Sequence, residues 1–115
     1  MRQLPPPNDF APDARDLWSA AQRQLRLQGT WERTDVPLVE MYCRNLVAAR
    51  AARKSADETV HSSSVDYRAA VKQAQDAEAA AFALAKVLLL TPEARKRHGI
   101  SAKPGEKSEL DALIR

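Results

Sequence analysis

Alanine dominates residues 65–90, and this stretch constrains the fold more than any other part of the sequence. It occupies positions 69, 70, 74, 77, 79, 80, 81, 83 and 85. Alanine has the highest helix propensity of the amino acids, and its small side chain lets two helices approach closely. We therefore expect one long helix over residues 65–90, packed against another helix or against a neighbouring subunit, in an all-α fold.

The apolar side of this long helix predicts contacts between subunits. Aromatic residues make up only 5% of the 115 residues, so the apolar content is mostly alanine, leucine and valine. A chain of this length and composition builds a limited core, and self-association would compensate for it. An intramolecular hairpin with the preceding helix is an equal alternative and does not exclude oligomer contacts. The candidate oligomer contacts are Ala70, Val71, Ala74, Ala77, Ala81, Leu84 and Leu88.

Two further helices are predicted before the long one, over residues 12–28 and from the connector at 30–34 to about residue 58. Apolar residues recur in both at steps of three and four, which is the helical period. Gly29 is placed to end the first helix in a left-handed conformation. Thr34 is the expected N-cap of the second.

The remaining local signals predict short helices. A polar break at residues 61–64 precedes the long helix, and Thr91 with Pro92 can cap and start a helix over 92–98. Ser108 can cap one last turn. No stretch of the sequence has the alternating pattern of a strand.

The two ends of the chain differ in composition from the helical domain at residues 13–100. Residues 1–12 are rich in proline and predict a mobile, extended arm. Residues 101–115 predict a flexible C-terminal tail. The tail carries an apolar edge that is either disordered or a docking segment for a partner. That edge consists of Leu110, Leu113 and Ile114.

Positive charge is concentrated in two places. The net charge is +3 and the sequence pI is about 9.3, which permits contact with nucleic acid without requiring it. The segment from Met41 to Ala56 contains no acidic residue, and a second basic run follows Pro92. The alternative is a solvated helix face. The basic residues are Arg44, Arg50, Arg53 and Lys54 in the first group and Arg95, Lys96 and Arg97 in the second.

The sequence offers no recognisable catalytic or metal-binding pattern. His61 and His98 lie in different segments without metal-ligand spacing, and Cys43 is expected to be a buried thiol. Three glycines in the chain leave no phosphate-binding loop. The apolar run at 82–90 is too short to span a membrane. We predict a soluble intracellular protein that is not an enzyme and holds no cofactor and no metal.

A spaced set of residues runs through the chain in an order typical of one known family. The set comprises Leu4-Pro5-Pro6, Leu17-Trp18, Leu25, Gly29, Asp35, Leu38, Tyr42-Cys43, Leu90-Thr91-Pro92 and Arg95. Over residues 4–98 the chain resembles the small subunits of tailed-bacteriophage terminases. It departs from them in two respects. Leu89 stands where many relatives have glycine, and the break at 61–64 is shorter than their glycine-containing loop.

The resemblance implies a helical, non-enzymatic subunit that recognises DNA in a packaging motor. Such subunits assemble into rings, bind double-stranded viral DNA in the host cytoplasm and deliver it to a large subunit that holds the ATPase and nuclease. On this basis both basic groups are candidate phosphate contacts, because the guanidinium fork suits phosphate. The apolar edge of the tail becomes the candidate contact for the large subunit. Two alternatives stay open: a small helical DNA-binding transcription regulator, and a helical adaptor without DNA contact.

Overall fold

The computed structural model describes residues 2–61, 64–99 and 109–114, and all regular structure in these ranges is helical. The all-α class predicted from the sequence is therefore confirmed for this part of the chain. Of the flexible tail predicted at residues 101–115, residues 101–108 and 115 lie outside the described residues, whereas residues 109–114 form a helix. The elements are α1 (Pro12–Gln28), the 3-10 turn η1 (Arg33–Asp35), α2 (Val36–Thr59), α3 (Ser64–Val87), α4 (Pro92–Arg97) and α5 (Glu109–Ile114).

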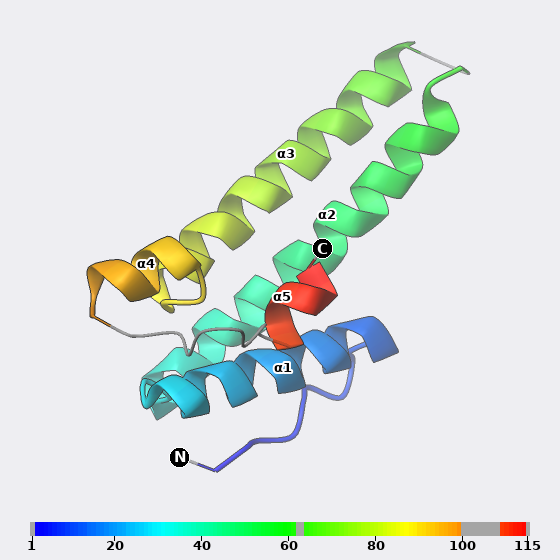
Figure 1. Cartoon of the computed structure of the whole chain (residues 1–115). Helices are drawn as coiled ribbons and strands as arrows, with labels where there is room; N and C mark the ends of the chain where they lie inside the picture. The colour runs from blue at the N-terminus through cyan, green and yellow to red at the C-terminus, as the bar shows by residue number, and fades with distance from the viewer. Residues whose placement is uncertain (1, 62–63, 100–108, 115) are drawn as a thin grey trace.

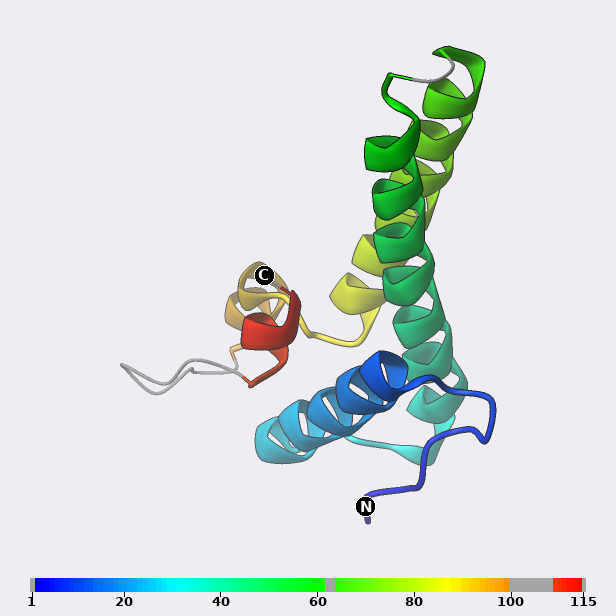
Figure 2. The same ribbon diagram turned by 90° about the vertical axis from the view of Figure 1, so that its right-hand side faces the viewer.

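A long antiparallel hairpin of α2 and α3 organises the molecule (Figures 1 and 2). Helix α1 lies across the base of the hairpin and packs on α2, and α5 packs on α1. Helix α4 follows the end of α3. The far half of the hairpin projects beyond the other helices, which gives an elongated shape of 47 × 31 × 23 Å.

Buried alanines hold the two long helices together. Helix α2 contributes Ala49, Ala52 and Ala56, and these pack toward the alanine-rich side of α3. Within one chain, the alanine-rich helix α3 thus forms the predicted intramolecular hairpin with α2. Its use in subunit contacts stays a prediction. Of the candidate oligomer residues, Ala70, Ala74, Ala81 and Leu88 are buried within the chain, and Val71, Ala77 and Leu84 are half-buried.

The main core lies where α1 crosses the base of the hairpin. Cys43 is buried there as expected, and burial, with a smaller effect of Glu40, raises the pKa of its thiol to about 12. The thiol is therefore neutral at physiological pH and acts as an apolar side chain. The most deeply buried large side chains are Leu17, Trp18, Gln22, Leu25, Val39, Cys43 and Leu110.

Side chains of α1 hold the N-terminal arm by hydrogen bonds to the backbone of Leu4. The Gln22 side chain is fully buried. Its Oε1 accepts a hydrogen bond from the Leu4 amide at 2.6 Å, and its Nε2 donates to the Leu4 carbonyl at 3.0 Å. The Trp18 indole also donates to this carbonyl at 3.0 Å. These bonds satisfy the polar groups of an extended segment that has no secondary structure of its own.

The rest of the arm is held by aromatic side chains. Trp31 donates to the Arg2 carbonyl at 3.2 Å, and the Phe10 ring meets Trp18 edge-on with centroids 6.0 Å apart. The proline-rich composition predicts a mobile arm at residues 1–12, whereas its described part lies against the domain. The arm is held there because the Trp18 and Trp31 indoles and the Gln22 side-chain amide form hydrogen bonds with its backbone.

The long helix ends at Val87, short of the expected end at residue 90. Leu89 adopts a left-handed backbone conformation with φ of 61°, and the Leu90 amide donates to the Ala85 carbonyl at 2.8 Å. This is the hydrogen bond of a C-terminal cap that usually contains glycine. Leu88 and Leu90 are both buried, and their packing compensates for the unfavourable backbone of Leu89.

Two of the predicted helix caps are confirmed and one is corrected. Gly29 ends α1 with φ of 72°, and the Thr91 hydroxyl accepts a hydrogen bond from α4 at 3.1 Å. Thr34, the predicted N-cap of the second helix, lies inside η1 instead. A capping box between Glu32 and Asp35 stabilises this turn, with the Glu32 amide donating to Asp35 at 3.1 Å. Asp35 directly precedes α2.

Candidate nucleic-acid interface

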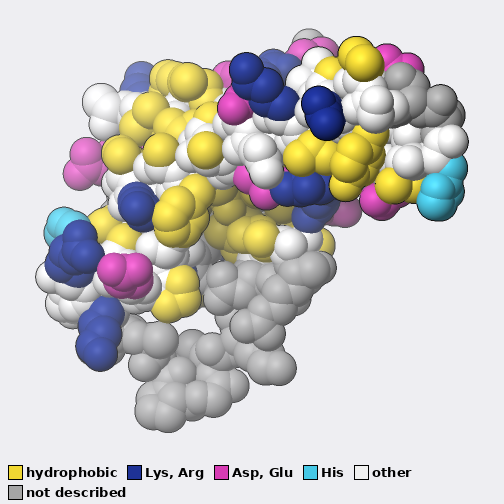
Figure 3. Space-filling model, turned by 90° about the horizontal axis from the view of Figure 1, so that it is seen from above, with side chains coloured by type: hydrophobic (Ala, Val, Ile, Leu, Met, Phe, Trp, Pro, Cys, Tyr) yellow, Lys and Arg dark blue, Asp and Glu magenta, His cyan; other side chains and the backbone are white. Residues whose placement is uncertain are grey.

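The seven basic candidates lie in two separate groups. Arg44, Arg50, Arg53 and Lys54 are on α2, and Arg95, Lys96 and Arg97 are on α4. Seen from above, basic side chains gather at the α4 end and again over the hairpin, with apolar and acidic side chains between (Figure 3). The groups do not form one continuous patch on this face, so each candidate is described by its own contacts.

Arg44 is occupied by contacts within the chain. Its guanidinium binds both carboxylate oxygens of Asp9 at 2.9 and 3.2 Å and Glu40 at 2.9 Å. It also lies 4.9 Å from the centre of the Phe10 ring. Hydrogen bonding to Arg44 holds the pKa of Asp9 below its usual value. Arg44 therefore fastens the N-terminal arm to α2 through Asp9, and a phosphate would have to displace two carboxylates to reach it.

Arg53 is also paired within the chain. Its Nε donates to Glu78 of α3 at 2.6 Å and its Nη2 to the second oxygen at 3.3 Å. The bidentate bond lowers the pKa of Glu78 and raises that of Arg53. Both side chains are about half-exposed, where such a pair adds little stability. The pair links α2 to α3, and Glu78 neutralises the charge of Arg53.

Arg95 is buried, unlike its two basic neighbours. Its residue is 7% exposed, and Nη1 donates to the Leu90 carbonyl at 3.3 Å and to Gln28 at 3.4 Å. The side chain thereby ties α4 to the end of α1. The sequence places three cations in a row, but the helical turn directs this one inward, so Arg95 has no surface to offer a phosphate.

The other cations of α4 point outward. Arg97 pairs with Glu93 one turn earlier at 3.0 Å, which is a weak exposed pair that an external anion can replace. For Lys96, the described part of the chain shows no hydrogen bond or ion pair. Helix α4 thus keeps two accessible cations of the three predicted.

Arg50 and Lys54 form the accessible part of the α2 group. They are one helical turn apart and both are exposed, so they lie on the same side of α2. Lys54 has no ion pair or hydrogen bond among the described residues. Arg50 donates a hydrogen bond from Nη2 to the Leu113 carbonyl of α5. No acidic residue lies on α2 between Met41 and Ala56.

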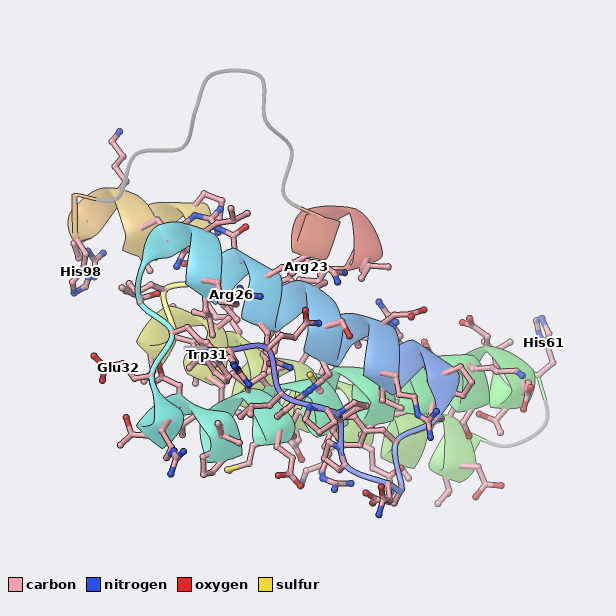
Figure 4. All side chains as sticks on the ribbon, turned by 90° about the horizontal axis from the view of Figure 1, so that it is seen from below. Arg23, Arg26, Trp31, Glu32, His61 and His98 are labelled. Carbon is pink, nitrogen blue, oxygen red and sulfur yellow. The ribbon has the colours of Figure 1, made fainter. Side chains whose placement is uncertain are left out.

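Helix α1 contributes arginines that do not belong to the two basic groups predicted from the sequence. Arg23 and Arg26 lie on α1 in the region flanked by α4 and α5 (Figure 4). The sequence does contain a signal for them, because residues 17–31 include no acidic residue. Arg26 is exposed in the last turn of α1, close in the chain to Gln28, which α4 contacts through Arg95.

The predicted partner contacts are largely inside the chain. Leu110 is fully buried in the main core and Leu113 packs against it, whereas Ile114 is 41% exposed. Exposed large apolar side chains are found instead on α1, where Leu27 is 85% exposed, and on the hairpin. Phe82 is 53% and Val87 68% exposed on α3, and Met41 is half-exposed on α2.

The described residues contain no group of three or more His, Cys, Asp or Glu side chains that could hold a metal ion. None of the described helices is long and apolar enough to cross a membrane.

Comparison with known proteins agrees with the family suggested by the spaced residues. No match is found among curated proteins or among solved structures. One family model matches, described as phage terminase, small subunit, and it covers residues 14–104. This range contains both basic groups and α2 to α4, with nearly all of α1. The chain therefore belongs to the phage terminase small-subunit family.

Proposed function

We propose that this chain binds double-stranded viral DNA and presents it to the large terminase subunit for packaging in the host cytoplasm. It would act as a recognition subunit without catalysis of its own, while the ATPase and nuclease belong to the large subunit. Membership of the terminase small-subunit family supports the role in packaging. The observation that carries DNA binding is the acid-free segment of α2 from Met41 to Ala56, on which Arg50 and Lys54 are exposed.

The contacts of the basic residues favour a backbone-binding mode. Arg50, Lys54, Lys96 and Arg97 are exposed, and their cations can each approach a phosphate. Phosphate contacts position a protein on DNA without reading its sequence. Four such contacts, divided between two separate groups in one chain, bind weakly, so an assembly that repeats them would be needed for useful affinity.

Self-association is the second part of this proposal. The inner side of α3 is already covered by α2, so the subunit contacts would use the side chains that stay exposed, with Phe82 and Val87 as the main candidates. A ring would repeat the α2 surface around an axis and multiply its phosphate contacts. Native mass spectrometry should detect assemblies at micromolar concentration, and Phe82→Glu should shift them toward the monomer. A wild-type chain that is only monomeric would contradict this part.

A salt series of fluorescence-anisotropy titrations with duplex DNA tests the binding surface. The test variant carries Arg50→Gln and Lys54→Gln, which removes two exposed charges without breaking the Arg53–Glu78 pair. We expect weaker binding and a slope of log K against log salt that is less steep by about 0.9 for each phosphate that the variant no longer neutralises.

The matched control carries Arg68→Gln and Lys72→Gln on α3. It has the same charge change and the same one-turn spacing, also at exposed positions. If both double variants lose affinity and slope equally, net charge rather than the α2 surface drives binding. If the wild-type chain shows no salt-dependent DNA binding, the result contradicts the proposed DNA binding and favours the adaptor alternative. Dimers on a palindromic site would instead favour a transcription regulator.

A further inference from the structure

Helix α5 is docked by one end on the core and by the other on the proposed DNA surface. Leu110 at its start is fully buried in the core formed with α1. At its end, the Leu113 carbonyl accepts a hydrogen bond from Arg50 of α2. Figure 1 shows α5 in front of α2, above α1. In this position α5 buries Leu110, and its Leu113 carbonyl engages the guanidinium of Arg50.

The two possible ligands of Arg50 are chemically alike. The last carbonyls of a helix have no partner within the helix and carry partial negative charge. A DNA phosphate is also an acceptor, with a full negative charge. Arg50 provides the donor in both cases, and a phosphate placed at its guanidinium would meet the negative end of α5. One side chain thus serves two acceptors that repel each other.

We propose that α5 and the DNA backbone compete for Arg50, so that DNA binding loosens α5 and exposes Leu110 and Leu113 to a partner protein. This rests on the proposed DNA-binding function. The partner surface that suits α5 is an apolar groove that accepts two leucines three residues apart on one side of a short helix. In the free chain α5 is docked on the core, and in the DNA-bound chain its two leucines are exposed to the partner.

Linkage makes the effect reciprocal. If DNA weakens the docking of α5 by some factor, then release of α5 strengthens DNA binding by the same factor. Couplings between sites are typically about 5- to 150-fold. Arg50 is exposed and has further N–H groups that can bind phosphate while one is engaged, so we expect about fivefold, the low end of that range.

Affinity for a duplex at low salt tests the coupling in the full-length chain. Leu110→Glu places a charge in the core and should release α5. The matched control is Ile114→Glu, with the same charge on the same helix at an exposed position. Leu110→Glu should bind DNA about fivefold more tightly than Ile114→Glu. In an Arg50→Gln background the two should bind equally, because the shared donor is gone.

Hydrogen exchange gives a second measurement that needs no substitution. Saturating duplex should raise exchange at residues 110–114 of the wild-type chain, and the core of α1 should stay protected. If DNA binds but α5 stays protected, and Leu110→Glu binds no more tightly than its control, the coupling is refuted while DNA binding stands. If the wild-type chain binds no duplex, the proposed function fails together with the coupling.

Discussion

The docking of the arm leads to a sharp prediction, because one buried side chain holds both polar groups of a single residue. Gln22→Ala removes the acceptor of the Leu4 amide and one of the two donors to the Leu4 carbonyl. Each hydrogen bond contributes about 1 kcal/mol net, and a buried amide left without a partner costs about 1–3 kcal/mol more. With two hydrogen bonds lost, we therefore expect the free energy of unfolding to fall by about 3–5 kcal/mol.

Urea unfolding followed by tryptophan fluorescence measures this decrease in stability. Trp18 and Trp31 are the two tryptophans of the chain, and both donate to carbonyls of the arm. Their emission should therefore shift to longer wavelength as the arm leaves. Protein concentration must be the same for all variants, since association with other subunits would add to the apparent stability.

Gln24→Ala is the matched control for this prediction. It makes the same change on the same helix, at a half-buried position where the side chain donates a hydrogen bond to Gln28 of that helix. Its effect should stay within about 0.5 kcal/mol, as for most surface substitutions. If Gln22→Ala is no less stable than Gln24→Ala and its emission is unchanged, the arm contributes nothing to the fold and the reasoning is refuted.

Three further predictions concern the end of α3, the start of α4 and the buried thiol. Because Leu89 is left-handed, Leu89→Gly should be more stable than Leu89→Ala by about 1 kcal/mol in thermal or urea unfolding; the opposite order would contradict the assigned backbone. Thr91→Ala should cost about 1 kcal/mol, whereas Thr91→Ser should restore most of it; equal stability of the two would exclude the cap. The raised pKa of Cys43 means that the folded state keeps a proton that the unfolded state loses. Its contribution to stability is therefore lost as pH rises from about 9 to about 12, at up to about 1.4 kcal/mol per pH unit. Cys43→Ala should show a shallower decline than wild type in pH-dependent urea unfolding, and identical profiles would refute the assignment.

The features that could be predicted from the sequence are those set by a few neighbouring residues. Gly29 ends α1 and Thr91 caps α4, because left-handed glycine and hydroxyl capping depend only on local backbone geometry. Leu89 shows the limit of this reasoning. Leucine rarely adopts a left-handed conformation, and the burial of Leu88 and Leu90 compensates for it here, together with the cap hydrogen bond from Leu90 to Ala85. Tertiary packing thus sets the end of α3.

The candidate site depends on contacts between distant parts of the chain, which the sequence alone does not reveal. Arg44 and Arg53 look like free cations in an acid-free stretch, yet their partners are Asp9 and Glu78. Arg95 looks as exposed as its neighbours until the helical turn directs it inward. Charge counted along the chain therefore overstates the number of cations accessible to a phosphate.

The projecting half of the α2–α3 hairpin has a consequence for local unfolding. Beyond α1, small alanine contacts and the Arg53–Glu78 pair hold the two helices together, and the tip exposes Val60 and Val65. Little buried area means a low free energy of local opening. Amide protection should therefore decline steadily from the crossing with α1 toward the tip. Any neighbouring subunit that covers this half would slow exchange most at the tip, so the profile of protection along the hairpin would record how much of it the assembly buries.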